Sequence, residues 1–122
     1  MDDPAHANPF RKLYYGDNQD IFSEGENGDV MYFVERGEVR IWTGRPPNDR
    51  TLSTIGSGGF FGEMALIDGK PRSANATACG DVEIRAIPGT TLRRKLHNAD
   101  PFVKALVRIL VENLRSTTGG RA

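Results

Sequence analysis

The sequence predicts a mainly β fold, an antiparallel β-roll or jelly-roll barrel with flanking helices. Short apolar runs alternate with clusters of turn residues from Tyr14 to Ile87, at spacings too tight for helices. In the runs VRIW and VEIRAI the apolar residues alternate, so each strand should have one face in a core and the other in water. After Pro88 the apolar spacing becomes that of amphipathic helices, which places two helices at the end of the chain.

The predicted strands are delimited by turn residues. These stand in the segments GENGD, RG, TGRPPND, GSGG, DGKP and CGD, which supply positive φ angles or preset a turn. Two sheets built from the intervening strands and facing each other would make a jelly roll or a flattened barrel. We predict strands at Asp20–Ser23, Val30–Glu35, Val39–Thr43, Thr51–Ile55, Ser73–Ala78 and Val82–Ile87.

The two closing helices follow from capping residues and apolar spacing. Thr90 or Thr91 can cap the first, which runs through LRRKLHN, and Asp100 can cap the second, with Pro101 in its first turn. The second should end near Arg115. Its apolar residues cover an arc of roughly 200°, wider than contact with one sheet face requires. We therefore expect it to bury a further surface, against the preceding helix, a ligand or another chain. The arc comprises Phe102, Val103, Leu106, Val107, Ile109, Leu110, Val111 and Leu114.

Length and charge limit the organisation of the chain. Its 122 residues suit a single domain over residues 1–122, with the β-roll at about 14–88 and the helices at about 89–116. Sixteen acids balance sixteen bases, so the whole molecule has no strong field for nucleic acid or a membrane. The distribution is uneven, because residues 1–88 carry fourteen acids and nine bases, whereas residues 89–122 carry two acids and seven bases.

Few residues are available for metal or covalent chemistry. Cys79 is the only cysteine, which excludes an intramolecular disulfide, and we expect it to be a small core residue. His6 and His97 are the only histidines, and neither has another type of metal ligand at a useful spacing. No Ser/His/Asp arrangement is visible. We therefore expect no metal or other cofactor and no enzymatic activity.

The expected location is cytoplasmic. The N-terminal MDDPAHANPF is acidic and lacks an apolar signal region, and no apolar run approaches the roughly eighteen residues of a membrane span. The run Arg93, Arg94 and Lys95 could contact nucleic acid, but such a run is more often a solvated helix face, and no helix-turn-helix follows it. We expect neither a membrane nor nucleic acid as a partner.

The segment FGEMALIDGKPRSANATA, from Phe61 to Ala78, has the residue types of an anion site. Its GEMAL portion predicts a single helical turn whose first amides are free to attract an anion, and glycine allows close approach to the backbone. Arg72 can clamp a phosphate through two hydrogen bonds, Ser73 adds a hydroxyl and Ala74 an accessible amide. Glu63 would repel phosphate but can accept a hydrogen bond from a sugar hydroxyl. The set indicates a pocket for a sugar phosphate.

This segment resembles the phosphate-binding cassette of the cyclic-nucleotide-binding domain family, found in catabolite activator proteins and in regulatory subunits of cyclic-AMP-dependent kinase. The upstream IFSEGENGDVMYFVERGEV is similar to the family's second and third strands, with turns at Gly25, Gly28 and Gly37. Both motifs lie within residues 19 to 78. The expected fold is thus an antiparallel β-roll with a short N-terminal helix, a one-turn phosphate-binding helix and two C-terminal helices.

The resemblance implies a role for each matching residue. Arg72 would neutralise the cyclic phosphate and Glu63 would bind the ribose 2′-hydroxyl. The remaining ligand contacts would come from Gly62, Ser73 and Ala74 at the phosphate oxygens and from Phe61 and Met64 along the sugar–base pocket. Serine at position 73 leaves the base undecided, since threonine there often accompanies cyclic-GMP selectivity, and cyclic AMP is the default.

The resemblance allows two alternative forms of function for this chain. In the first, a cyclic mononucleotide, cyclic AMP in preference to cyclic GMP, repositions the C-terminal helices, which signal to a separate protein partner or drive self-association. In the second, an interaction module of the same fold binds no ligand and acts through its helices alone. The second form makes Glu63 and Arg72 a surface ion pair worth about 0 to 1 kcal/mol.

Overall fold

The computed structural model describes the backbone of residues 10–117, and the side chains of these residues except 67, 68, 111 and 114–117. Six strands and three helices follow one another along this part of the chain. They are β1 (Arg11–Tyr15), β2 (Asp20–Phe22), β3 (Val30–Thr43), β4 (Arg50–Ile55), β5 (Phe60–Phe61), α1 (Glu63–Asp68), β6 (Asn75–Pro88), α2 (Gly89–His97) and α3 (Pro101–Thr117).

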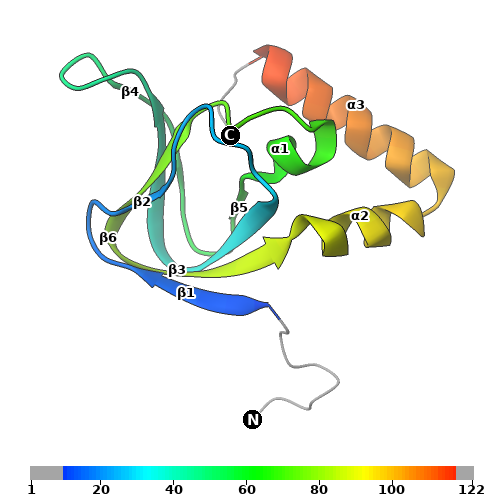
Figure 1. Ribbon diagram of the computed structural model, residues 1–122, viewed down its shortest axis with the longest axis horizontal. Helices are drawn as coiled ribbons and strands as arrows, with labels where there is room; N and C mark the ends of the chain where they lie inside the picture. Colours follow the sequence, from blue (N-terminus) through cyan, green and yellow to red (C-terminus); the bar gives the residue numbers. More distant parts are fainter. Residues whose placement is uncertain (1–9, 118–122) are drawn as a thin grey trace, which may run out of the picture.

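The strands form one antiparallel sheet in the order β1-β6-β3-β4, with β2 paired to β6 and β5 paired to β3. The sheet curls on itself, with the helices beyond one end (Figure 1). The predicted antiparallel β-roll is confirmed. A helix does not precede it within the described residues, because Arg11–Tyr15 is a strand paired with β6. Residues 1–9, the other place where the expected N-terminal helix could lie, are outside the described part.

Two predicted turns are wrong. RG and CGD do not reverse the chain, because they lie inside the long strands β3 and β6, which pair with each other on both sides of them. Arg36 pairs with Glu83 and Glu38 with Cys79, so one residue of β3 faces three of β6. Gly37 has a φ of +94°, and a Cβ there would lie 2.4 Å from the Asp81 carbonyl oxygen. The glycines of RG and CGD therefore make a bulge that bends the two paired strands.

The core lies inside the curled sheet. The alternation predicted in VRIW and VEIRAI is confirmed, since Val39, Ile41, Val82 and Ile84 are all buried. Cys79 contradicts its prediction, because it is exposed. Ala76 and Ala78 point inward on the same strand, so the next residue points outward. The other members of the core are Phe22, Val34, Ile55, Phe61 and Ala74.

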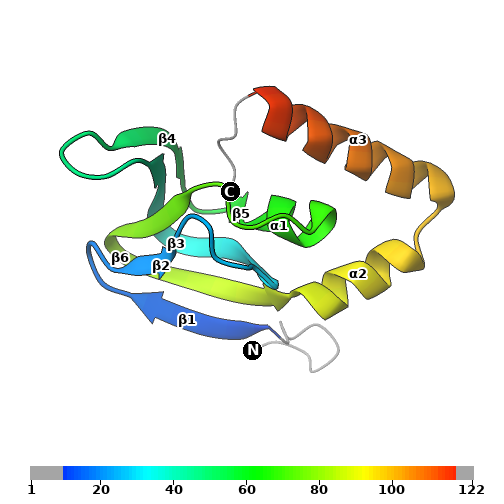
Figure 2. The ribbon, with the colours of Figure 1, turned by 45° about the horizontal axis from the view of Figure 1, so that its top comes forward.

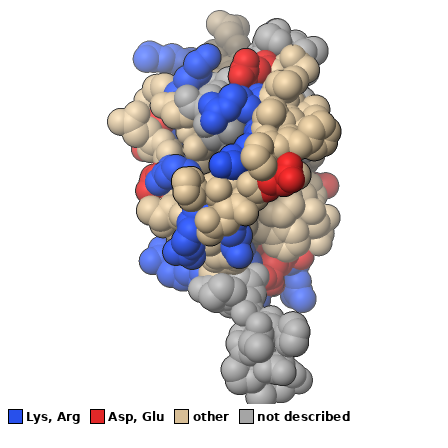
Figure 3. All heavy atoms as spheres, turned by 90° about the vertical axis from the view of Figure 1, so that its right-hand side faces the viewer, with Lys and Arg blue, Asp and Glu red and all other residues tan. Residues whose placement is uncertain are grey.

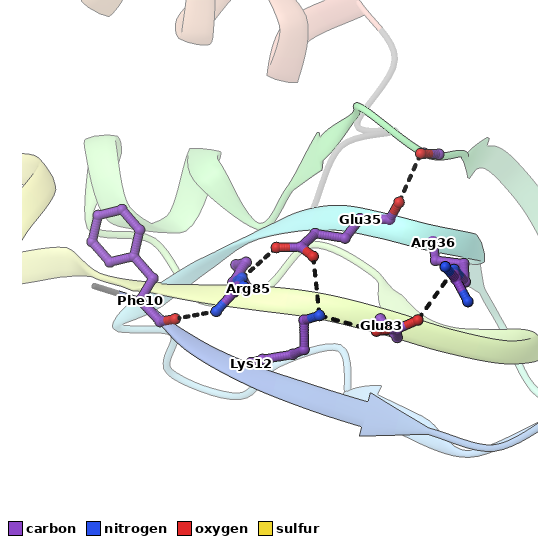
Figure 4. Close-up of polar contacts among 7 residues, drawn as sticks. Phe10, Lys12, Glu35, Arg36, Glu83 and Arg85 are labelled. Atoms are coloured by element: carbon purple, nitrogen blue, oxygen red, sulfur yellow. Dashed lines mark hydrogen bonds and ion pairs between the residues drawn. The ribbon is translucent and has the colours of Figure 1, made fainter. Parts of the chain in front are cut away.

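An ion network crosses three strands on the outer face of the sheet (Figure 4). Lys12 Nζ on β1 lies 3.1 Å from Glu83 Oε1 on β6 and 3.3 Å from Glu35 Oε2 on β3. Arg85 on β6 donates to Glu35, and Arg36 Nε lies 3.2 Å from Glu83 Oε2. The Arg85 hydrogen bond is the main reason that the pKa of Glu35 is lowered, with Lys12 acting in the same direction. Through Lys12, the network connects the edge strand β1 to β6 and β3.

The helices cover the open end of the sheet. Helix α1 lies between the sheet and α3, and α2 continues directly from β6 (Figures 1 and 2). The predicted caps Thr90 and Thr91 are wrong, because α2 begins at Gly89 with no side-chain cap. Instead, the Gly89 amide donates to the carbonyl oxygen of Asp29 at 2.8 Å, so a loop of the roll satisfies this helix end.

Helix α3 begins as predicted and leaves much of its apolar arc in solvent. The Phe102 amide donates to Asp100 Oδ1 at 2.7 Å, which confirms Asp100 as the cap. Phe102 is 72% exposed and Ile109 is 54% exposed. Val103, Leu106 and Leu110 are exposed on the same helix. Within the described residues this face has no covering element, in line with the excess width of the predicted arc.

Candidate anion-binding site

The cassette folds around two glycines that flank α1. Gly62, with φ +82°, precedes the helix, and Gly69, with φ +73°, follows it. A Cβ at Gly62 would lie only 2.7 Å from Arg72 Nη1, so both the left-handed backbone and the contact with arginine require glycine there. This arrangement sets the start of α1 against the Arg72 side chain.

Arg72 is the centre of the site and is only 4% exposed. Its Nη1 donates to the Gly62 carbonyl at 2.9 Å, and its Nη2 donates to the Val30 carbonyl at 2.6 Å. A Cβ on Gly28 would lie 2.3 Å from Arg72 Cζ. The guanidinium is therefore held by backbone carbonyls between two glycines, one from the cassette and one from the loop before β3.

Aromatic rings line one side of the same guanidinium. Arg72 Cζ lies 4.1 Å from the centroid of the Phe22 ring and 5.9 Å from that of Tyr32. Phe61 completes the cluster, 5.0 Å from Tyr32 between ring centroids. Rings stabilise a nearby cation through their electron-rich faces. They also exclude water, and burial raises the pKa of the Tyr32 hydroxyl, although the charge of Arg72 opposes this.

The electrostatics of the site favour an anionic ligand. Burial lowers the pKa of Arg72, while attraction to Tyr32, Glu26 and Glu63 opposes that shift. Two buried side-chain atoms of the described residues make no hydrogen bond, and they are Arg72 Nε and Glu63 Oε2. A buried donor of a charged group is costly unless it finds an acceptor. Arg72 Nε is thus a donor in place for an acceptor that the protein itself does not supply.

The predicted site residues lie on one continuous segment but differ in exposure. Glu63 and Ser73 are partly exposed, whereas the side chains of Phe61, Met64 and Ala74 are fully buried. Strand β6 begins at Asn75 rather than at the predicted Ser73, which leaves Ser73 and Ala74 in a bend. The burial of Arg72 disagrees with the surface ion pair that the ligand-free alternative assumed.

Sequence reasoning missed the residues that surround the guanidinium. Phe22 and Tyr32 supply rings, and Gly28 and Val30 supply backbone, all from parts of the chain well before Arg72. Gly28 was recognised as a turn residue but not as a neighbour of Arg72. No local pattern could show that Phe22 lies against an arginine, because the contact exists only after the sheet has curled.

The site is physically connected to α2 through the loop before β3. The Arg72 amide donates to the Glu26 carbonyl at 2.8 Å, and the Arg72 side chain holds the Val30 carbonyl. Between those two residues stands Asp29, whose carbonyl accepts from the Gly89 amide and whose Oδ1 lies 3.0 Å from Arg93 Nη2. One short loop therefore contacts both the arginine and the first turns of α2.

Such a roll, with a helix set between glycines beside a buried arginine, is suited to binding a phosphate-bearing ligand. Residues 12–99 match the family model of the cyclic nucleotide-binding domain. The chain belongs to the cyclic nucleotide-binding domain family, which confirms the resemblance of its cassette.

Two curated relatives indicate the range of proteins that contain this domain. The chain is 32% identical over 103 residues to the CRP-like cAMP-activated global transcriptional regulator of Mycobacterium tuberculosis, over 84% of this chain and 46% of that protein. It is 38% identical over 78 residues to the cAMP-dependent protein kinase regulatory subunit of Eremothecium gossypii, over 64% of this chain and 16% of that protein. The chain thus spans less than half of either relative. Because one relative is a transcriptional regulator, the expectation that nucleic acid is not a partner receives no support.

Solved structures show the same fold. The cAMP-bound form of the EAL enzyme Bd1971 matches with 36% identity and a TM-score of 0.79, over 86% of this chain and 28% of that chain. Its cGMP-bound form matches with 36% identity and a TM-score of 0.78, over the same shares of the two chains. The Thermus thermophilus catabolite activator protein matches with 31% identity and a TM-score of 0.72, over 88% of this chain and 51% of that chain.

Two further features of the described residues concern metal sites and membrane spans. Among the side chains that the structure describes, no group of three or more His, Cys, Asp or Glu residues is placed to hold a metal ion. None of the helices described is both long and apolar enough to cross a membrane.

Proposed function

We propose that this domain binds a cyclic mononucleotide at the Arg72 site, cyclic AMP in preference to cyclic GMP, and acts as a regulatory sensor. One observation carries the proposal: Arg72 is buried between two glycines with Nε as an unused hydrogen-bond donor. Family membership supports the class of ligand. The role requires no catalysis, so we propose that the protein is not an enzyme. We also propose that it is cytoplasmic.

The proposed contacts assign charge recognition to one set of residues and sugar recognition to another. Arg72 and the amides of Gly62, Ser73 and Ala74 bind the cyclic phosphate. Glu63, the first residue of α1, accepts a hydrogen bond from the ribose 2′-hydroxyl. Phe61 and Met64 are fully buried, so they shape the sugar–base pocket from beneath.

The loop before β3 gives the proposed sensor a route to its helices. A phosphate that engages Arg72 competes with the carbonyls of Gly62 and Val30 for the same guanidinium. Any movement of Val30 is passed to its neighbour Asp29, which holds the start of α2. The ligand then favours one placement of α2 and α3, to the extent that it binds that placement more tightly.

The second candidate is a module of the same fold that binds no nucleotide. It is favoured by the two backbone hydrogen bonds that Arg72 already makes to Gly62 and Val30. Such a module would act through the exposed apolar face of α3 alone. Two observations favour the sensor instead: the unused Nε donor of Arg72, and the cradle that Gly28 and Gly62 form around its guanidinium.

A thermal-shift screen with cyclic AMP, cyclic GMP and a cyclic dinucleotide tests the proposal. A ligand that binds only the folded state raises the unfolding temperature according to its concentration and affinity. The sensor predicts the largest rise with cyclic AMP, a smaller one with cyclic GMP and none with the dinucleotide, which needs a larger pocket. No rise with either mononucleotide would favour the ligand-free module.

A further inference from the structure

A groove of about 770 Å³ lies where β1, the end of β6 and the first turns of α2 meet. None of the seven residues assigned to nucleotide recognition lines it. Its polar lining consists of Arg11 on β1 and of Thr91, Arg94 and Lys95 on α2. Its volume is in the range of ligand sites, so it is large enough for a ligand with several functional groups.

The charged residues that line this groove in the described part of the chain are all basic. Arg11, Arg94 and Lys95 are exposed, and no acid is among the described lining residues. No ion pair that the structure describes involves any of these three. Lys and Arg side chains gather across the face that carries α2 (Figure 3). Three cations that no carboxylate of the described chain satisfies call for an acidic occupant.

The floor of the groove is apolar, which narrows the class of occupant. Val30, Ala86 and Pro88 form it, together with Phe10. A nucleic-acid backbone would neutralise the cations but would leave this floor without a partner. A peptide that combines acidic side chains with an apolar or aromatic one satisfies both. Because the cations and Pro88 are exposed, the groove is open, as suits a segment that lies along a surface.

The groove also touches the route from Arg72 to α2. Val30 lines it and accepts the hydrogen bond from Arg72 Nη2 at 2.6 Å. Pro88 and Thr91 stand on either side of Gly89, whose amide is held by Asp29. An occupant of the groove therefore contacts the residues through which a nucleotide would shift α2.

We propose that this groove docks an acidic segment of a protein partner, with carboxylates at Arg11, Arg94 and Lys95 and an apolar side chain on the floor. The inference deepens the proposed function by giving the chemistry of the separate partner, and its link to nucleotide binding rests on that function. The docking site itself stands on the groove alone.

Fluorescence anisotropy with a labelled acidic peptide, rich in Glu and with one central Phe, tests the docking site. We expect saturable binding that weakens as salt is raised. The charge reversal Arg94→Glu/Lys95→Glu should weaken binding by at least about tenfold. Arg11→Glu should weaken it from a separate element. The matched control is Arg45→Glu/Arg50→Glu, which makes the same charge change at exposed positions outside the groove.

Further probes separate the possible occupants. Replacing the Phe of the peptide by Ser should weaken binding, and a Lys-rich version should not bind. Absence of binding to the acidic peptide, or equal loss in the control variant, would overturn the docking site. A DNA duplex that binds more tightly than the peptide, and is lost in the same groove variants, would overturn it in favour of nucleic acid.

The same variants separate this inference from the proposed function. Calorimetry with cyclic AMP should give the same affinity for Arg94→Glu/Lys95→Glu as for the unaltered protein, because the groove lies outside the cassette. Peptide binding without any binding of cyclic AMP would support the groove and contradict the sensor. Loss of cyclic AMP binding in the groove variant would contradict a separate docking site.

Discussion

Arg72 shows how a single side chain can be positioned almost entirely by backbone. Its two terminal nitrogens donate to carbonyls from β3 and from the cassette, and glycines leave room for it on both sides. A buried cation of this kind is normally paired with a carboxylate, because the uncompensated charge is expensive. Carbonyl dipoles and the Phe22 ring compensate only in part, and the remaining donor is available to a phosphate.

Gly28→Ala tests the cradle around Arg72. Gly28 does not have a positive φ, so its backbone tolerates alanine, but the new Cβ would lie 2.3 Å from Arg72 Cζ. We expect overpacking to destabilise the fold by about 1–3 kcal/mol and the displaced guanidinium to bind cyclic AMP at least about tenfold more weakly. Gly56→Ala is the matched control, since nothing lies within 4 Å of its added Cβ. Unchanged affinity in Gly28→Ala would show that the cradle is not needed.

Glu63 is tested by removing its proposed hydrogen-bond donor from the ligand. Cyclic 2′-deoxy-AMP should bind the unaltered protein about 10- to 150-fold more weakly than cyclic AMP, because a hydrogen bond to a charged group contributes about 1.5–3 kcal/mol. In Glu63→Ala the two ligands should bind alike. Calorimetric titration of both proteins with both ligands measures the coupling. If the deoxy ligand bound the unaltered protein equally well, Glu63 would lose its assigned role.

At the scale of elements, β3 and β6 are the two longest strands and pair with each other. The bulge that they share bends both strands. The glycines that sequence analysis assigned to turns at RG and CGD do adopt positive φ angles, so their conformation was predictable. Whether such a glycine reverses a chain or bends a strand depends on its partner strand. That partner lies far away in the sequence, which is why two long strands were predicted as four short ones.

The ion network on the outer face makes stability depend on pH on the acid side. Because Arg85 and Lys12 lower the pKa of Glu35 in the folded state, its contribution is present at neutral pH. It is lost as the pH falls below the ordinary value of 4.5 and through the folded pKa. Glu35→Gln should therefore lower the free energy of unfolding at pH 7 by about 1 kcal/mol or less and flatten its decline below about pH 5.

Urea unfolding of Glu35→Gln between neutral and acidic pH measures this effect. The matched control is Glu38→Gln on the same strand, since Glu38 is exposed and takes part in none of the described ion pairs. Parallel pH profiles for Glu35→Gln and the unaltered protein would contradict a stabilising role for the network.

At the scale of the whole molecule, the domain has a well-buried roll and an incompletely covered helical end. Helix α1 contacts β3, α2 and α3, so the cassette connects the sheet to the helices. The outer face of α3 remains exposed, and we expect a protein partner or a second copy of the chain to cover it. The excess width of its apolar arc was visible in the sequence, but the arc itself could not indicate what covers it.

Substitutions on that face should separate association from stability. Leu106→Glu and Ile109→Glu replace side chains that are exposed on α3. We expect the free energy of unfolding to change by no more than about 0.5 kcal/mol. Any concentration-dependent sedimentation of the unaltered protein should be abolished. A large loss of stability in dilute samples would show that the face is buried within the folded chain.

The sequence indicated which residue types make up the cassette, but not which distant residues surround them. The arginine, the carboxylate and the glycine of the cassette stand in a recognisable order within one continuous segment, so the proposed roles of these residues could be inferred locally. The rings of Phe22 and Tyr32, the Gly28 cradle and the Asp29 contact with α2 depend on the curled sheet. These long-range contacts leave no periodic signal in a single sequence.

The central claim is that Arg72 binds the phosphate of a cyclic nucleotide, and calorimetric titration of cyclic AMP into the unaltered protein and Arg72→Ala tests it most directly. Circular dichroism and Arg72→Lys, which keeps the charge but loses the planar fork, distinguish loss of binding from loss of fold. Arg45→Ala serves as an exposed control. We predict saturable binding in the unaltered protein and the control, weaker binding in Arg72→Lys and none in folded Arg72→Ala. Equal binding by folded Arg72→Ala, or no heat with any of the proteins at high ligand concentration, would contradict the account.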